Sequence, residues 1–222
     1  TTLLKLIYRE LYPVAGEDSR VLILGRERWD VWELREHIGM LSPDLQSGFS
    51  QNATVLEVIV SGFFSSIGVH HQLREHIQPS QLEKSREVMD TLGLETLADR
   101  AFDTLSTGQQ RRCLLGRALV HDPDTLIFDE PTSGLDLAAG FDYLDRDRDL
   151  ARRGKSLVIV THHLGEIPPE IERVIILKDG RMHADGEKSS VLTAEVLSEV
   201  YGVSLRVTEI EGHFLVYPAD QT

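Results

Sequence analysis

Two short apolar segments, one followed directly by two acids and the other ending two residues before a histidine, constrain the fold of this chain most tightly. Residues 125–128 (Thr-Leu-Ile-Phe) precede Asp129 and Glu130, and residues 156–160 (Ser-Leu-Val-Ile-Val) lead to His162. Such continuous apolar runs predict strands of a parallel sheet that is covered on both faces. The 32 residues from Glu130 to His162 leave room for one helix and a return strand. The polar ends of both strands should therefore meet at one edge of an α/β sheet.

The remaining pattern predicts helices and strands on both sides of this unit. Residues 52–97 are mostly helical, with breaks at Gly62, Gly68, Pro79 and Gly93, and few β-branched runs. We therefore expect an all-helical insertion in an α/β chain. The other expected elements are helices at 2–12, 32–37, 107–121, 138–153 and 190–201, strands at 21–24 and 38–41, a hairpin at 174–184 around Asp179-Gly180, and a strand pair at 204–209 and 213–217 around Glu211-Gly212.

Charge and composition exclude several classes of protein. A net charge of -13 argues against a nucleic-acid-binding surface, because phosphate contacts need clustered Lys and Arg. No run approaches the roughly 18 apolar residues of a membrane-spanning helix, and no signal peptide is expected at the N-terminus. Cys113 is the single cysteine and lies in an apolar helical stretch. We expect it to pack in the core of a protein from a reducing, cytoplasmic compartment.

A third polar segment, residues 105–112 (Leu-Ser-Thr-Gly-Gln-Gln-Arg-Arg), opens an amphipathic helix. Ser106 and Gly108 could present a hydroxyl and free backbone N–H groups to an anion at the positive end of the helix dipole. The alternative is a simple N-cap, since Ser106 is a good capping residue without any ligand.

The strand ends offer carboxylate and imidazole chemistry. Asp129 could hold Mg²⁺ through water, and Glu130 could polarise an attacking water. His162 could hydrogen-bond a transferred phosphate, whereas His163 is expected to be structural. The alternative is that both strands end in ordinary polar turns. Two adjacent acids at the end of an apolar strand favour a function.

Taken together, these segments resemble the ABC ATPase family. Residues 105–109 match its LSTGQ-type signature, 125–130 its Walker B segment, and 133–136 (Ser-Gly-Leu-Asp) its D-loop, while His162 matches the switch histidine. Residues 1–6 (Thr-Thr-Leu-Leu-Lys-Leu) resemble the helix that directly follows the Walker A Gly-Lys. The resemblance runs through nearly the whole chain in the family's order.

The resemblance implies a P-loop NTPase-like, mostly parallel sheet with an inserted helical subdomain. The whole chain, 1–222, would be one ABC ATPase domain that is incomplete at its N-terminus. Within it, residues 52–110 would form the helical subdomain that ends at the signature. Residues 111–222 would form the rest of the α/β core with its C-terminal hairpin, helix and strand pair.

The resemblance also implies ATP and Mg²⁺ as cofactors and a role for each matching residue. Glu130 would be the general base and His162 would lie near the γ-phosphate, while Asp129 and Thr1 would support Mg²⁺. Two copies would close head-to-tail, so that the signature residues contact nucleotide held by the other copy. The implied nucleotide-binding residues are Thr1, Thr2, Gln46, Ser106, Gly108, Gln109 and Asp136.

Two departures from the family pattern weaken this assignment. The G-x-x-x-x-G-K phosphate cradle and the strand before it are absent, so a chain that begins at Thr1 should bind ATP poorly and hydrolyse it negligibly. The glutamine of the Q-loop is also displaced. Ser42 holds its expected position, and Gln46 follows four residues later.

Three functions remain open at this stage. The leading one is the ATPase subunit of a membrane importer, cytoplasmic and peripheral at the inner face of the membrane, with transmembrane permease subunits as partners. Residues 186–202 resemble the end of import cassettes for iron-siderophore complexes, haem or vitamin B12, and residues 41–43 a molybdate-type relative. The alternatives are a soluble ABC ATPase acting on nucleic acid or ribosomes, and a nucleotide-gated interaction module without turnover.

Overall fold

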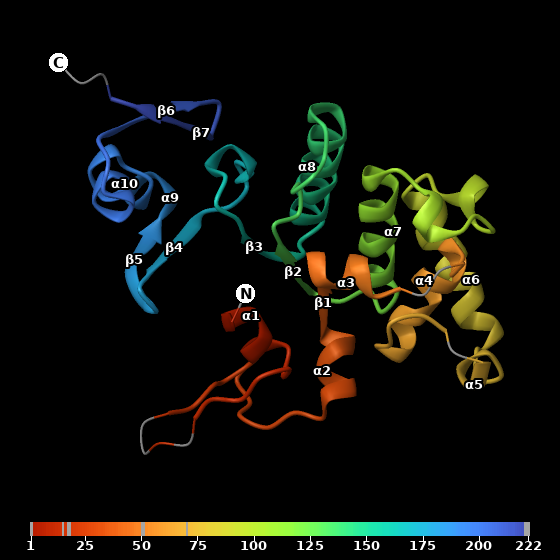
Figure 1. Cartoon of the computed structure of the whole chain (residues 1–222). Coiled ribbons are helices and arrows are strands. Elements are labelled where there is room, and N and C mark those ends of the chain that lie inside the picture. Colours follow the sequence, from red (N-terminus) through yellow and green to blue (C-terminus); the bar gives the residue numbers. More distant parts are fainter. Residues whose placement is uncertain (1, 15, 17–18, 50–51, 70, 220–222) are drawn as a thin grey trace.

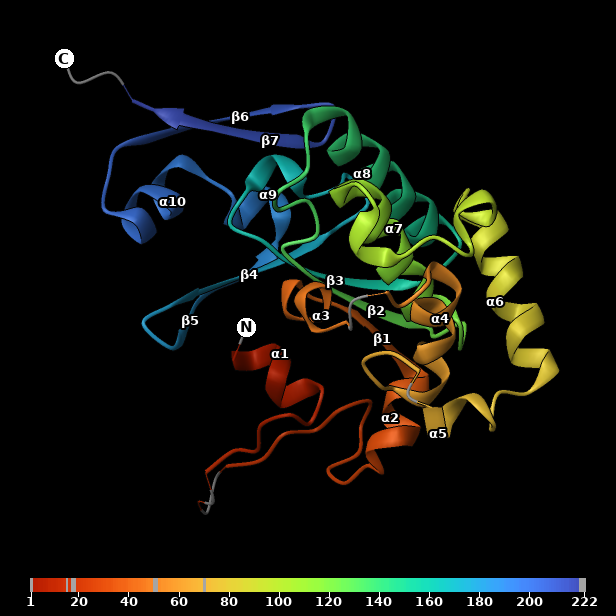
Figure 2. The same ribbon diagram turned by 45° about the vertical axis from the view of Figure 1, so that its right-hand side comes forward.

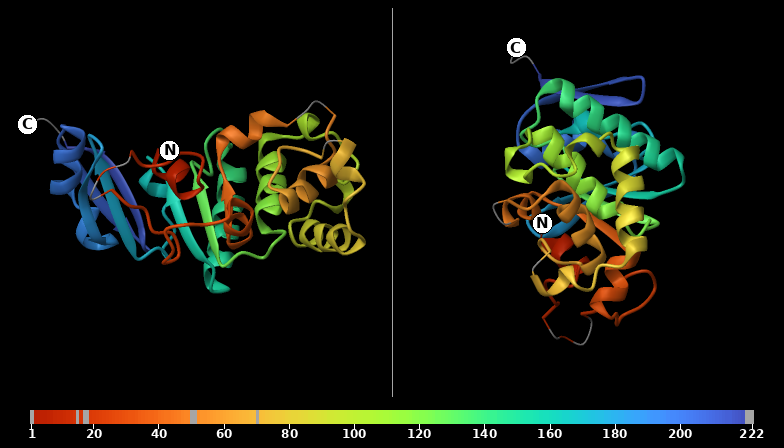
Figure 3. Two further views of the ribbon diagram at one scale, coloured as in Figure 1. Left: turned by 90° about the horizontal axis from the view of Figure 1, so that it is seen from below. Right: turned by 90° about the vertical axis from the view of Figure 1, so that its right-hand side faces the viewer.

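The computed structural model describes residues 2–14, 16, 19–49, 52–69 and 71–219, apart from the side chains of residues 46, 47, 71 and 72. A parallel sheet lies at the centre of the molecule (Figure 1). A block of helices lies at one end and the C-terminal hairpins at the other, as the left view of Figure 3 shows.

The central sheet has the predicted parallel strands. Strands β1 (Ile38–Leu41), β2 (Thr125–Asp129) and β3 (Ser156–Val160) pair in the order β1-β2-β3. Helices α7 (Thr107–Leu119) and α8 (Leu137–Arg152) lie together beside this sheet (Figure 2). The prediction that both later strands are covered on both faces holds for β2 but is wrong for β3. Among the described residues β3 pairs only with β2, and Val158 is 41% exposed.

The stretch predicted as helical consists of short helices. Thr54 starts one of them with a reciprocal cap, in which its hydroxyl accepts from Glu57 N and the Glu57 carboxylate accepts from Thr54 N. The break predicted at Pro79 is wrong, because a helix begins there. Proline is tolerated in the first turn of a helix, where the N–H that it lacks would be unpaired in any case. The elements are α4 (Val55–Val60), η1 (Ser61–Phe64), α5 (His71–Arg74), α6 (Pro79–Thr91), η2 (Glu95–Leu97) and η3 (Phe102–Thr104).

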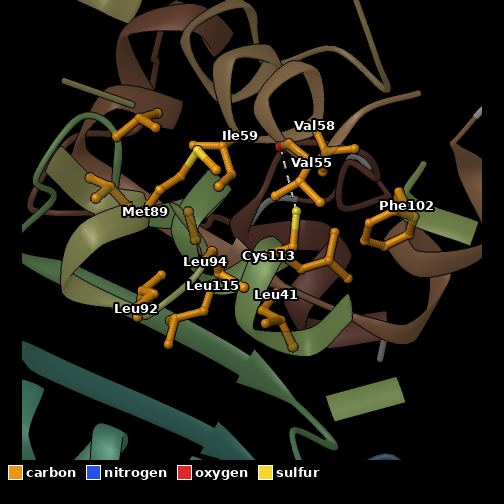
Figure 4. Close-up of a cluster of buried hydrophobic side chains, with 14 of the residues drawn as sticks. Leu41, Val55, Val58, Ile59, Met89, Leu92, Leu94, Phe102, Cys113 and Leu115 are labelled. Carbon is orange, nitrogen blue, oxygen red and sulfur yellow. Dashed lines mark hydrogen bonds between the residues drawn. The ribbon is translucent and has the colours of Figure 1, made fainter. Parts of the chain in front are cut away.

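One hydrophobic cluster joins this helical block to the sheet. Figure 4 shows side chains from α4, α6 and α7 converging above the strands. Cys113 lies among them, fully buried, with its Sγ 3.7 Å from Val55 O. The labelled members are Leu41, Val55, Val58, Ile59, Met89, Leu92, Leu94, Phe102, Cys113 and Leu115. Through this cluster, the helix that begins at residue 107 packs against both β1 and the helical block.

The N-terminal segment departs most from expectation. Helix α1 is Thr2–Ile7 and ends well before Pro13, because Arg9 adopts a left-handed conformation at φ 58°. The strand predicted at 21–24 is wrong. Ile23 and Arg26 instead exchange two 2.9 Å backbone hydrogen bonds across a tight turn with φ 47° at Leu24. The helices α2 (Val31–His37) and α3 (Pro43–Gly48) flank β1.

The C-terminal part contains the two predicted antiparallel pairs. Strands β4 (Arg173–Lys178) and β5 (Arg181–Glu187) turn at Asp179-Gly180, and β6 (Leu205–Ile210) and β7 (His213–Pro218) turn at Glu211-Gly212. All four turn residues have positive φ, as two-residue hairpin turns require. The single helix predicted at 190–201 is two helices, α9 (Lys188–Val191) and α10 (Ala194–Tyr201), because the Thr193 hydroxyl caps α10.

Candidate active site

The polar ends of β2 and β3 meet at one edge of the sheet. In the parallel register Asp129 pairs with Val160, and Glu130 N donates to Val160 O at 2.8 Å. The residues that follow, including His162, therefore leave the sheet beside Glu130, as the spacing predicts. We call Asp129, Glu130 and His162 the sheet-edge site.

Glu130 and His162 are in direct contact. Glu130 Oε1 lies 2.7 Å from His162 Nδ1. The other carboxylate oxygen of Glu130, Oε2, is buried and has no hydrogen-bond partner. Glu130 also has φ 48°, a conformation that costs a residue with a side chain on the order of 1–3 kcal/mol. A carboxylate held in a strained backbone, with one oxygen unused, is typical of a reactive group.

Asp129 lies deeper, at the end of β2, and is 5% exposed. Burial raises the pKa of its carboxyl above the usual range, and the nearby acids Glu130 and Asp44 raise it further. These causes disfavour the charged form of Asp129 in the protein alone. A bound cation would offset the repulsion among these acids. In the same segment the buried hydroxyl of Thr132 also has no hydrogen-bond partner.

This donor set fits Mg²⁺ rather than a metal held by protein alone. In the part of the chain that the structure describes, no three His, Cys, Asp or Glu side chains converge as metal ligands. Mg²⁺ is commonly bound by one or two carboxylates together with water and phosphate oxygens. Asp129 is suited to that role.

Helices α1 and α3 lie near Asp129. Leu4 packs with Met40 and Ile127 of the sheet, and Lys5 Nζ lies 3.3 Å from Asp44 Oδ2 of α3. These contacts place the start of α1, with Thr2 exposed, near the sheet edge.

Two of the residues proposed for nucleotide or metal binding lie wholly or partly outside the described part of the chain. Thr1 lies outside the described residues. Gln46 lies in α3, but its side chain is outside the description, and Ser42 is buried at the N-cap of α3 without a side-chain capping bond.

The signature residues occupy the start of α7. Ser106 caps the helix as the alternative interpretation expects: its hydroxyl accepts from Gln109 N at 3.3 Å, and Gln109 Oε1 accepts from Ser106 N at 3.1 Å. A Cβ atom on Gly108 would lie 3.2 Å from Ala139 Cβ, so α7 and α8 approach closely here. We call the hollow between them, of about 110 Å³, the signature groove. Its lining is Ser106, Gly108, Gln109, Arg112, Ala139, Asp142 and Tyr143.

The structure brings the predicted residues together in two groups rather than one. None of the sheet-edge residues lines the signature groove. Asp136 caps α8 at the groove side, where its Oδ1 accepts from Ala139 N at 2.9 Å. One chain therefore presents the two halves of the expected chemistry at different places.

Sequence reasoning missed Arg111, which connects these two groups. It is 2% exposed, and its Nη2 donates to Ser133 O at 3.3 Å, so the signature helix is tied to the segment that follows Glu130. Burial lowers the pKa of the guanidinium, while Tyr143 and Asp129 act in the opposite direction. An arginine within a helix is ordinarily exposed, so no sequence pattern indicates that Arg111 is buried.

Comparison with known proteins identifies the family. The family model of the ABC transporter matches residues 1–133, more than half of the chain. The chain belongs to the ABC transporter family. The ABC transporter ATP-binding protein YlmA of Bacillus subtilis (strain 168), itself uncharacterised, is 34% identical over 212 residues, 93% of this chain and 78% of that protein. Hemin import ATP-binding protein HmuV of Aliivibrio fischeri is 31% identical over 206 residues, 91% of this chain and 75% of that protein.

Solved structures confirm the fold of this ABC protein. The ADP conformation of MJ1267, an ATP-binding cassette of an ABC transporter, superposes with a TM-score of 0.72. The match covers 90% of this chain and 82% of that one, at 23% identity. The predicted α/β fold with a parallel sheet is thus confirmed as that of an ABC ATPase cassette. Cassettes of this family bind and hydrolyse ATP. Among the described residues of this one, no helix is long and apolar enough to span a bilayer.

Proposed function

We propose that this chain is the ATP-binding and ATP-hydrolysing subunit of an ABC importer. The single observation that carries the proposal is the pair at the sheet edge. Glu130 Oε1 contacts His162 Nδ1 at 2.7 Å, while Glu130 Oε2 is buried without a partner. An unpartnered carboxylate oxygen is what a general base for water needs.

Each sheet-edge residue has a distinct part in the proposed reaction. Bound ATP would supply the phosphoryl group, and Mg²⁺ would neutralise negative charge on its phosphate oxygens. Asp129 holds the cation through its buried carboxylate, directly or through water. The Glu130 carboxylate would accept the proton of the attacking water. His162 orients Glu130 by donating from Nδ1 to its carboxylate, and Nε2 would donate to a phosphate oxygen when both ring nitrogens carry a proton.

A second copy of the cassette completes the site in this proposal. Ser106, Gly108 and Gln109 line a groove away from the sheet edge of their own chain. Head-to-tail pairing would bring this groove to nucleotide held at the partner's sheet edge, where the start of α7 favours an anion. Thr1, Thr2 and Gln46 would complete the nucleotide contacts within one chain, with the Thr1 hydroxyl on the cation, and Asp136 would lie at the dimer face.

Transmembrane permease subunits are the other proposed partners, which places the cassette at the inner face of the membrane. For the solute, the relative named for hemin import supports a metal-chelate class, such as haem, iron-siderophore or vitamin B12. A molybdate-type solute is the alternative for the same kind of importer.

Steady-state ATP hydrolysis by the natural full-length protein tests the proposal. We expect Glu130→Gln to lower the rate by roughly 100-fold or more, because the amide cannot accept the proton of water. Glu172→Gln is the matched control, since Glu172 lies outside the site, and should keep the parental rate. A Glu130→Gln rate within a few-fold of the parent would refute the role of this residue.

A further inference from the structure

The loop that carries His162 rests on the C-terminal part of the chain. After Val160 the chain forms η4 (Leu164–Glu166), and the Thr161 hydroxyl donates to Glu166 Oε2 at 2.8 Å. We call residues 161–167 the switch loop. Its apolar side chains, Leu164 and Ile167, pack in the cluster built around Leu192, Leu197 and Phe214. The apolar side of the switch loop therefore packs against the C-terminal hairpin β6–β7 and helix α10.

Lys188 fastens this hairpin to the chain just beyond the switch loop. The residue is 8% exposed, and its Nζ donates to Pro168 O and Pro169 O at 3.1 Å and to Gly212 O at 3.2 Å. An ammonium has three donors, so these three carbonyls use all of them. Burial lowers the pKa of this ammonium. Such an arrangement is costly unless every donor is satisfied, and here every donor is.

Gly212 permits the close approach that Lys188 requires. It has φ 80°, in the region that favours glycine. A Cβ atom on Gly212 would lie 2.9 Å from Pro169 Cβ, which is too close without a shift of the backbone. The hairpin turn is thus in direct contact with the chain just beyond the switch loop.

The switch loop and the hairpin also form the two sides of one open groove of about 680 Å³. His162, His163 and Glu166 line one side, and Leu205, Phe214 and Val216 line the other. A shift of the hairpin would therefore change the surroundings of the histidine that contacts Glu130.

We propose that Lys188 is a positioning residue for His162. By tying β6–β7 to Pro168 and Pro169, it holds the switch loop so that His162 Nδ1 stays against Glu130. Lys188 touches no reacting group, and the inference rests on the proposed function only in so far as His162 takes part in hydrolysis. A partner that binds the hairpin would therefore change the position of His162, and with it turnover, without touching the nucleotide site.

The test compares Lys188→Met with Lys178→Met in the full-length protein. Lys178 is the matched control, because it is in the same C-terminal part and its Nζ also donates to a carbonyl, Glu199 O at 2.8 Å. The first measurement needs no hydrolysis: the ring resonances of His162 and the amide exchange of residues 163–167, without nucleotide. In Lys188→Met the ring resonances should move, and exchange should rise by about tenfold or more. Lys178→Met should match the parent.

The second measurement is turnover. Lys188→Met should lower kcat on the order of tenfold to a hundredfold, as displaced catalytic groups do, with the KM for ATP within about twofold of the parent. Gly212→Ala disturbs the same contact without removing Lys188 and should give the same pattern if Lys188→Met fails to fold. Unchanged His162 resonances in a folded variant of either kind would overturn the positioning role. Because these resonances do not depend on hydrolysis, failure of this inference is distinguishable from failure of the proposed function.

Discussion

Replacement of Asp147 by leucine should stabilise the protein. Asp147 lies in α8, one turn after Tyr143, and is 0% exposed. Both of its carboxylate oxygens are buried without a hydrogen-bond partner, and so is the Tyr143 hydroxyl. Burial raises the pKa of the Asp147 carboxyl well above its usual range, because it disfavours the charged form in the folded protein.

The magnitude follows from the two terms that the substitution changes. An unsatisfied buried polar group costs about 1–3 kcal/mol, and a well-buried leucine contributes about 1.5–3 kcal/mol. Allowing for imperfect fit of the larger side chain, Asp147→Leu should raise the free energy of unfolding by about 2–4 kcal/mol at pH 7. For a chain of this length, this corresponds to a rise in Tm of about 5–12 °C.

The pH dependence provides an independent check. A carboxyl whose pKa is raised in the folded state binds its proton more tightly there than in the unfolded chain. The parental free energy of unfolding should therefore fall as pH rises above the ordinary value of 3.8 toward the raised folded pKa. Asp147→Asn removes this titration, so it should resemble the parent at low pH and be the more stable protein at high pH.

Urea unfolding followed by tryptophan fluorescence measures these differences. Asp145→Leu is the matched control on the same helix, because its side chain is 77% exposed, and it should change stability by less than about 0.5 kcal/mol. A destabilised Asp147→Leu, together with a parent whose stability does not fall with pH, would show that the carboxylate has partners. That result would refute the reasoning.

Two further predictions concern the core. Gly62→Ala should cost about 2 kcal/mol or more in urea unfolding, because its Cβ would lie 2.3 Å from Arg117 O and 2.7 Å from Val120 Cγ2. Gly140→Ala, in open space within α8, should instead be neutral or stabilising by up to about 1 kcal/mol. Equal changes in the free energy of unfolding for the two substitutions would contradict the packing argument. Burial raises the pKa of the Cys113 thiol far above its usual range, so Ellman's reagent should label it at least about a hundredfold faster in urea than in the folded protein. Rapid labelling of the folded protein would show that this core opens easily.

Local signals in the sequence predicted most of the elements correctly. Apolar runs that end in polar residues identified β2 and β3, and the pairs Asp179-Gly180 and Glu211-Gly212 identified both hairpins. The sheet edge followed from the same signals, because parallel strands end together. Glu130 and His162 were therefore predicted to be neighbours, and they are in contact.

The errors arose where tertiary contacts decide the outcome. The apolar run at 21–24 resembles a strand, but Ile23 pairs with Arg26 across a tight turn, and no local pattern specifies which partner a run will find. Burial of Arg111, Asp147 and Lys188 was equally unpredictable, since charged residues are expected on the surface. Their environments depend on which segments pack against them.

The most direct test of the account is the mass in solution of the Glu130→Gln protein, full length, with and without Mg-ATP. In the proposed dimer, each ATP site is divided between two copies of the chain, one of which supplies the sheet edge and the other the signature groove. Sedimentation velocity should therefore show a monomer without nucleotide and a dimer with ATP, and Gly108→Asp added to Glu130→Gln should abolish the dimer. A protein that stays monomeric while binding ATP, or a dimer that survives Gly108→Asp, would contradict it.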